Sequence, residues 1–91
     1  MTTRYTLHPE LRLTRLGDEG VALHLGSRRY FTVSETGVDI LEALKTPSTL
    51  ADIVARLTSS YDVTPELAEK SARDFLDNGR RHGLLHVEDA P

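Results

Sequence analysis

The sequence contains no cysteine and no tryptophan, and none of its hydrophobic runs is long. Without cysteine, the chain can form no disulfide, no thiolate metal site and no cysteine nucleophile. The absence of an apolar run near the roughly 20 residues that cross a bilayer excludes an integral membrane protein. The first residues also lack the apolar stretch of a secretory signal, so we expect a cytoplasmic protein.

The 91 residues, with 38% hydrophobic content, are typical of one small globular domain. We expect this domain to span residues 1–91, with an ordered core over about 11–87 and frayed ends. The formal net charge of -3 is mildly acidic, whereas nonspecific binding to nucleic acid depends on a basic surface. The charge therefore disfavours a role on nucleic acid.

Hydrophobic and polar residues alternate in the first third of the chain, which is the two-residue period of a half-buried strand. Three such runs predict strands over 11–16, 20–25 and 28–33. Glycine-containing segments separate these runs, and glycine supplies the positive φ that tight hairpin turns require. We therefore predict a three-stranded antiparallel meander.

After residue 33 the hydrophobic spacing becomes helical. Three residues stand where a helix N-cap is expected, namely Ser34, Thr49 and Thr64. The first helix ends before Pro47, and the third opens with Pro65 and runs to Arg81 or His82, ahead of Gly83. The predicted fold class is α+β and winged helix-turn-helix-like, with a three-stranded antiparallel sheet followed by three helices.

The third helix has an unusually thin apolar stripe. Its members are Ala68, Ala72, Phe75, Leu76 and Gly79. Small side chains permit close packing of the helix on the sheet; alternatively, they leave a shallow trough beside Phe75 and Leu76 in which another molecule lies.

No pattern for catalysis is visible. The four histidines are interpreted as surface residues: His8, His24, His82 and His86. His82 and His86 are four residues apart, but Gly83 lies between them, and no cysteine or carboxylate pair completes a metal site. The glycines match no phosphate-binding loop or nucleophile elbow. We therefore predict a protein that is not an enzyme, with no catalytic residue, metal or cofactor.

A winged-helix DNA-binding regulator is one alternative, but its third helix should present basic or amide side chains from its first turns. This helix presents Glu66 and Glu69 there. The third strand offers a second hypothesis, because an open sheet edge can accept an added peptide strand. Four arginines would then flank the groove and attract acidic residues of the peptide, namely Arg28, Arg29, Arg80 and Arg81. Alternatively, Arg28 and Arg29 only protect the edge from aggregation. A structural subunit whose edge pairs with a fixed protein partner is a third hypothesis.

Several segments, in this order, resemble PqqD-like proteins. Residues 33–41, Val-Ser-Glu-Thr-Gly-Val-Asp-Ile-Leu, are similar to the strand-to-helix segment of that family, commonly Leu-Asn-x-x-A/G-x-x-Ile-Leu. Residues 49–57 with Tyr61 resemble the second helix, and residues 72–76 followed by Gly-Leu-Leu at 83–85 resemble the last helix and its exit. The resemblance covers roughly residues 11–87. Two departures are Ser34, where the family usually has Asn, and Gly79, where a large apolar residue is frequent.

The resemblance implies a recognition element for ribosomally synthesised and post-translationally modified peptides (RiPPs). Such a domain binds the leader segment of a precursor peptide as a strand added to the third strand, against the third helix. It then delivers the leader to a maturation enzyme. A free-standing chain with an Arg-Tyr-Phe third strand is most similar to the leader-binding protein of lasso-peptide biosynthesis, whose partner is a leader peptidase of cysteine-protease type. The alternative within the family is the PqqD peptide chaperone of a radical enzyme.

Carried onto this sequence, the resemblance implies a binding site without nucleic acid or membrane as partner. The backbone of residues 29–33 would pair with the leader, an apolar pocket would receive its side chains, and two arginines would flank it. The residues concerned are Arg29, Tyr30, Phe31, Thr32, Val33, Ala72, Phe75, Leu76, Gly79 and Arg80.

Overall fold

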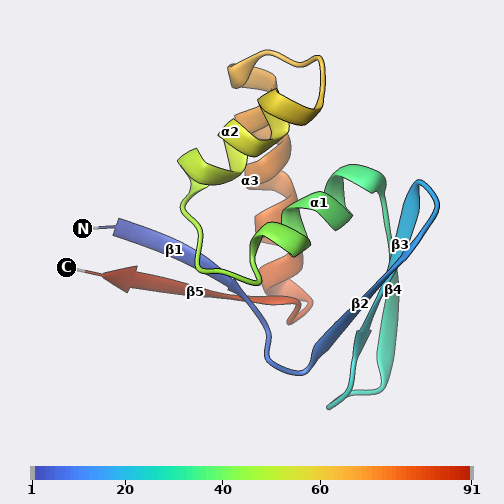
Figure 1. The fold of residues 1–91 in the computed structure, drawn as a ribbon. Coiled ribbons are helices and arrows are strands. Elements are labelled where there is room, and N and C mark those ends of the chain that lie inside the picture. The colour runs from blue at the N-terminus through green and yellow to red at the C-terminus, as the bar shows by residue number, and fades with distance from the viewer. Residues whose placement is uncertain (1, 91) are drawn as a thin grey trace.

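Two antiparallel sheets and three helices make up the computed structural model, which describes residues 2–90 (Figure 1). The elements in chain order are β1 (Thr2–Leu7), β2 (Leu11–Leu16), β3 (Glu19–His24), β4 (Arg29–Val33), α1 (Glu35–Ala43), α2 (Leu50–Ser60), α3 (Pro65–Arg81) and β5 (Leu85–Ala90). One sheet has the strand order β2-β3-β4, and the other pairs β1 with β5. In Figure 1, α1 lies between α3 and the three-stranded sheet, and the end of α3 reaches the start of β5.

The predicted meander is confirmed, with boundaries that differ by at most one residue. Its register places Ala22 of β3 between Leu13 of β2 and Phe31 of β4. Ala22 is fully buried, so this row faces the interior. The alternation of the sequence located the strands because one sheet face packs against the helices and the other meets solvent.

All three predicted N-caps are confirmed. The Ser34 Oγ accepts a hydrogen bond from the Gly37 N–H at 3.2 Å, and the Thr64 Oγ1 accepts one from the Leu67 N–H at 3.2 Å. Thr49 and Asp52 form a reciprocal capping box. Gly83, with φ of 74°, follows α3 in the left-handed conformation expected after a helix end.

The expectation of frayed ends is wrong for the described residues. β1 and β5 pair antiparallel over their whole lengths, from Thr2↔Ala90 to Leu7↔Leu85. Tyr5 of β1 also bridges to Ser48, ahead of α2. The second sheet was not predicted because its strands come from opposite ends of the sequence, and each alone is short and weakly patterned.

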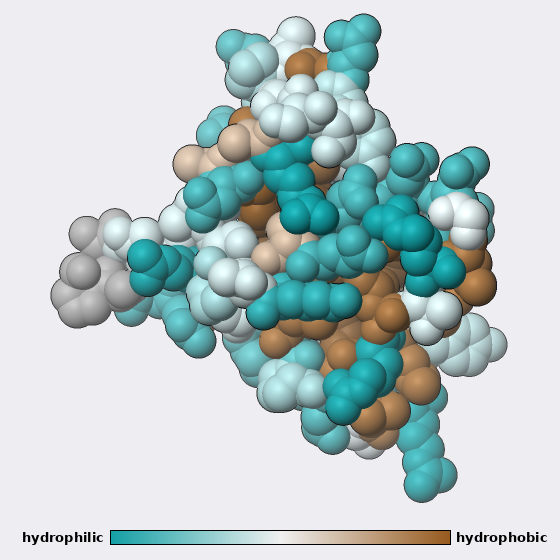
Figure 2. Space-filling model, in the orientation of Figure 1, coloured by the Kyte–Doolittle hydropathy of each residue, from teal (hydrophilic) through white to brown (hydrophobic). Residues whose placement is uncertain are grey.

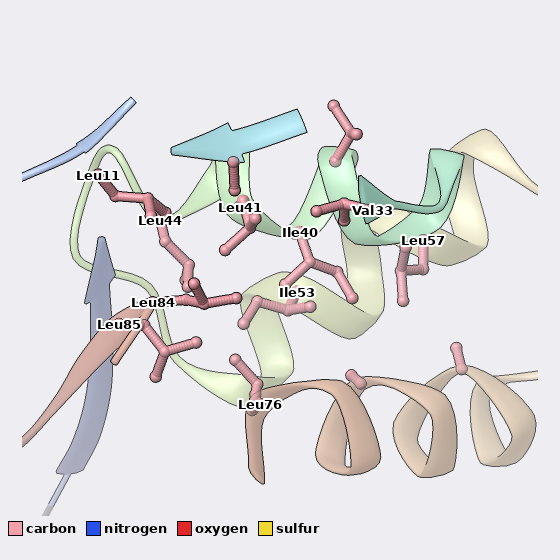
Figure 3. Packing of buried hydrophobic residues seen from close by; sticks show 14 residues of the cluster. Leu11, Val33, Ile40, Leu41, Leu44, Ile53, Leu57, Leu76, Leu84 and Leu85 are labelled. Atoms are coloured by element: carbon pink, nitrogen blue, oxygen red, sulfur yellow. The ribbon is translucent and has the colours of Figure 1, made fainter. Parts of the chain in front are cut away.

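The hydrophobic core lies around α1, between the sheets and the other two helices (Figure 3). Val38, Ile40, Leu41 and Leu44 of α1 and its C-cap are almost fully buried. Ile53 and Leu57 of α2, Leu76 of α3, and Leu84 and Leu85 at the start of β5 complete it. Within residues 2–90, no helix has the length and apolar character to cross a membrane.

Candidate functional site

The outer edge of β4 has no strand partner within the described part of the chain. β4 pairs with β3 on one side, from Gly20↔Val33 to His24↔Arg29, and it is last in the strand order. An edge strand presents backbone N–H and C=O groups that can pair with another strand. The edge is five residues long and contains no proline, so no position lacks a backbone donor.

Side chains of β4 alternate between the two faces of the sheet. Tyr30 is 72% exposed and Thr32 is also exposed, whereas Phe31 is half-buried and Val33 is buried. Tyr30 lies opposite Leu23 in the register, so both occupy the outer face. Most of the large hydrophobic side chains that are exposed belong to this part of the chain, namely Leu16, Leu23, Leu25 and Tyr30. Figure 2 shows brown, hydrophobic residues at the lower right, where the three-stranded sheet lies in Figure 1.

Helix α3 and its C-cap residue, His82, approach the inner side of the β4 edge. The rings of Phe31 and His82 lie 5.6 Å apart between centroids. Phe75 packs near the other end of β4, because a Cβ placed on Gly37 would lie 2.7 Å from Phe75 Cε1 and 2.5 Å from Val33 Cγ1. Phe75 and His82 are seven residues apart, which is two helical turns. We call Arg29–Val33, Phe75 and His82 together the β4 edge surface.

His82 was missed as a site residue by sequence reasoning, which treated it as an unremarkable surface histidine. The seven-residue spacing from Phe75 to His82 could have identified it. Residues at i and i+7 share a helix face, and Phe75 was already predicted to line the site. His82 is exposed, and its imidazole ring lies beside the Phe31 ring.

Three residues predicted to line an apolar pocket belong to the interior. Ala72 is fully buried, Leu76 is 3% exposed, and Gly79 is also buried. A Cβ on Gly79 would lie 2.8 Å from Leu85 Cδ2, so Leu85 fills the space that the sequence suggested was an open trough. Gly79 therefore permits close contact between α3 and β5, and the trough expected at this position is absent.

The two predicted arginine flanks separate in the structure. The Arg29 guanidinium lies 5.9 Å from the centroid of the Phe31 ring and belongs to the β4 edge surface. Arg80 lines a different surface hollow with Asp77 and Arg81. It follows Phe75 by five positions, which rotates it by roughly 140° around the helix. The structure therefore brings Arg29 to the edge and leaves Arg80 on another side of α3.

A polar network ties β2, α1 and the segment after α2 together behind this surface. The Tyr61 hydroxyl donates to Asp39 Oδ2, and Arg15 Nη2 donates to Asp39 Oδ1 at 2.8 Å. The hydrogen bond from Tyr61, helped by Arg15, holds the pKa of Asp39 below its usual value despite partial burial. The same bond, together with burial, raises the pKa of Tyr61 to about 12. These groups stabilise the fold and do not reach the edge.

Within the described residues, no group of three or more histidine, cysteine, aspartate or glutamate side chains is arranged to hold a metal ion. The β4 edge surface instead offers groups that suit pairing with an extended peptide. It combines backbone donors and acceptors, the aromatic side chains of Tyr30, Phe31 and Phe75, the imidazole of His82 and the cationic side chain of Arg29.

Comparison with known proteins shows the family of the chain. A family model described as "Coenzyme PQQ synthesis protein D (PqqD)" matches residues 19–85, which include β4 and all three helices. The solved structure "TbiB1 in Complex with the TbiA(beta) Leader Peptide" is similar over 94% of this chain and 99% of that chain, with 27% identity and a TM-score of 0.80. "Lasso peptide synthetase B1 complexed with the leader peptide" shares the fold, with 24% identity, a TM-score of 0.76 and coverage of 90% and 96%. No curated protein matches the sequence.

Proposed function

The chain belongs to the PqqD family and is a PqqD-like RiPP recognition element, and from this premise we propose that it binds the leader segment of a ribosomally synthesised precursor peptide. The leader would add as a fourth strand to the outer edge of β4. The observation that carries the proposal is this unpaired edge, with Phe31 and Phe75 beside it. A similar protein that has been solved with a leader peptide supports the same assignment.

Affinity and selectivity come from different parts of the proposed complex. Each backbone hydrogen bond contributes about 1 kcal/mol net and selects no sequence. Side chains at alternate leader positions face α3, where Phe31, Phe75 and His82 would contact them. Buried Ala72, Leu76 and Gly79 would support these rings from beneath. Arg29 would favour an acidic leader residue and act mainly on the association rate.

We propose that the whole chain acts as one non-catalytic peptide-recognition domain and delivers the leader to a maturation enzyme. A leader peptidase of cysteine-protease type in lasso-peptide biosynthesis is the proposed partner. Strand addition covers the edge of β4 and leaves the outer sheet face uncovered. That face, with Leu23 and Tyr30 exposed, remains available to an enzyme while the leader is bound.

We propose that the fold is winged helix-turn-helix-like but does not bind DNA. The first turn of α3 presents Pro65 and Glu66, and Glu69 follows on the next turn. These carboxylates would repel phosphate, whereas a recognition helix reads DNA with basic and amide side chains.

Fluorescence polarisation with a synthetic leader tests the proposal, and we expect a precursor gene beside this one to encode that leader. Leaders carrying backbone N-methyl groups at successive positions should lose affinity at every second residue, because alternate amides of an added strand face β4. The peptides methylated at the intervening positions are the matched controls. Equal loss at all positions, or none, would exclude strand addition.

A variant of the protein tests the side-chain contacts. Phe31→Ala should weaken leader binding by at least about tenfold, because it removes an aromatic contact at the centre of the interface. Thr14→Ala on β2, an exposed residue across the sheet from the edge, should leave affinity unchanged. Circular dichroism must show that both variants are folded, and unchanged affinity in folded Phe31→Ala would place the site elsewhere.

A further inference from the structure

Three histidine rings from different segments meet where the two sheets join. His8 follows β1, His24 ends β3 and His86 lies in β5. The ring centroids of His8 and His24 are 4.5 Å apart, and those of His8 and His86 are 4.7 Å apart. The backbone crosses the same junction, because the His8 N–H donates to the Leu84 carbonyl at 3.0 Å.

Hydrogen bonds fix the protonation state of two of these rings. The Glu10 N–H donates to His8 Nδ1 at 3.0 Å, and the Ser27 N–H donates to His24 Nδ1 at 3.2 Å. A ring nitrogen that accepts a hydrogen bond carries no proton, so this geometry suits the tautomer of each ring that carries its proton on Nε2. A second proton on either ring would sit on Nδ1 and point at a backbone N–H.

His24 also holds the turn from which β4 begins. Its carbonyl accepts a hydrogen bond from the Arg28 N–H at 2.8 Å. Arg28 has φ of 60°, the only positive φ of a non-glycine residue among the described residues. Such a conformation costs free energy and persists only where surrounding contacts impose it. Arg29, the next residue, is the first of the β4 edge surface.

The charges around the cluster are mixed. Glu10 favours a protonated His8, whereas each neighbouring imidazole would oppose it once charged. The charged groups nearby on the other elements are Arg12 of β2, Arg29 of β4 opposite His24, and Glu88 of β5 opposite Arg4. The pKa of His8 lies below its usual value, first because of burial and then because of His24 and His86, with Glu10 acting in the opposite direction.

We propose that His8, His24 and His86 form a proton-sensitive clasp, which holds the two sheets together and keeps the β3–β4 turn in its binding conformation only while the rings are neutral. The part that concerns peptide affinity rests on the proposed function. The part that concerns the sheet junction does not.

The direction of the pH effect follows from which state binds more protons. The folded state disfavours protonation of His8, so the unfolded state takes up that proton first, near the ordinary imidazole pKa of about 6.5. His8 therefore contributes fully to stability above that pH. Its contribution is lost as pH falls through 6.5 and below.

Thermal unfolding of the full chain in a chelator-containing buffer tests the sheet junction. Between pH 7.5 and pH 5.5, the Tm of the wild type should fall by on the order of 5 °C. The double variant His8→Asn with His24→Asn should show little of this fall, because asparagine can accept the same hydrogen bonds and does not titrate. His82→Asn, which removes the histidine outside the cluster, should retain the wild-type fall. An equal fall in the double variant would overturn the proposal.

Two further measurements keep the test decisive. Imidazole nitrogen shifts of the wild type at pH 7.5 should show the Nε2–H tautomer for His8 and His24, and the Nδ1–H tautomer on both would overturn the proposal even if the double variant does not fold. The synthetic leader should bind the wild type more weakly at pH 5.5 than at pH 7.5. The affinity should fall by about tenfold for each unit by which leader binding lowers the pKa of His8. The double variant should show no such change. Equal pH dependence in both proteins would overturn the link to β4. If the leader does not bind at any pH, the proposed function is contradicted, but the conclusion from the Tm measurement is not affected.

Discussion

At the scale of single residues, Tyr61 makes one hydrogen bond that connects distant parts of the chain. Its hydroxyl donates to Asp39 of α1, which also accepts from Arg15 of β2. Tyr61→Phe should lower the free energy of unfolding by about 1–2 kcal/mol, because a hydrogen bond to a charged group is lost in a half-buried position. Urea denaturation measures this loss. Tyr30→Phe is the matched control, since its hydroxyl group belongs to a side chain that is 72% exposed.

The hydrogen bond between Tyr61 and Asp39 should make the stability of the fold depend on pH in both the acid and the alkaline range. The pKa of Asp39 is lowered in the folded state, so its stabilisation is present above the usual carboxyl value near 4 and is lost as pH falls through that value and below. The pKa of Tyr61 is raised to about 12, so its stabilisation is lost as pH rises from about 10 through about 12. Tyr61→Phe should abolish the alkaline loss and reduce the acid one, and unchanged profiles would contradict the network.

At the scale of elements, substitutions of two helical glycines can distinguish an effect on the stability of the fold from an effect on leader binding. A Cβ on Gly37 of α1 would press on Val33 and Phe75, both next to the β4 edge, whereas one on Gly79 of α3 would press on Leu85 of β5. Both changes to alanine should destabilise the chain by about 1–3 kcal/mol through overpacking, partly offset by about 1 kcal/mol of helix propensity. Only Gly37→Ala should also weaken leader binding, which polarisation titration measures. Equal effects of both variants on affinity would contradict the position of the site.

The helices and the meander could be predicted because their signals are local. A cap such as Thr49 acts within one helical turn, and strand alternation reports a single buried face. The edge of β4 was also foreseeable, since the last strand of a meander has one neighbour. The positions of Arg80 and Gly79 depend on which side of α3 meets β5, and that depends on a sheet formed by the two ends of the chain. No local pattern carries such long-range information, so the sequence could not show that Gly79 packs against Leu85.

At the scale of the whole molecule, the β1–β5 sheet closes the fold by joining its two ends. Removing residues 87–91 should destabilise the chain, because it deletes most of the β5 ladder and the partly buried Val87. If these residues only frayed, the truncation would leave the Tm unchanged. Asp89→Ala is the matched control, since it removes one exposed hydrogen bond, from Thr3 at 2.7 Å, and keeps the ladder.

The expected result is a clear fall in Tm for the truncated chain and almost none for Asp89→Ala, because several backbone hydrogen bonds of about 1 kcal/mol each outweigh one exposed side-chain bond. Affinity adds a second readout. Leu84 and Leu85 remain in the truncated chain and still pack on α3, so the β4 edge surface should bind the leader normally at temperatures where the chain is folded. A loss of affinity in the folded, truncated chain would mean that the terminal sheet, and not β4 with α3 alone, takes part in the site.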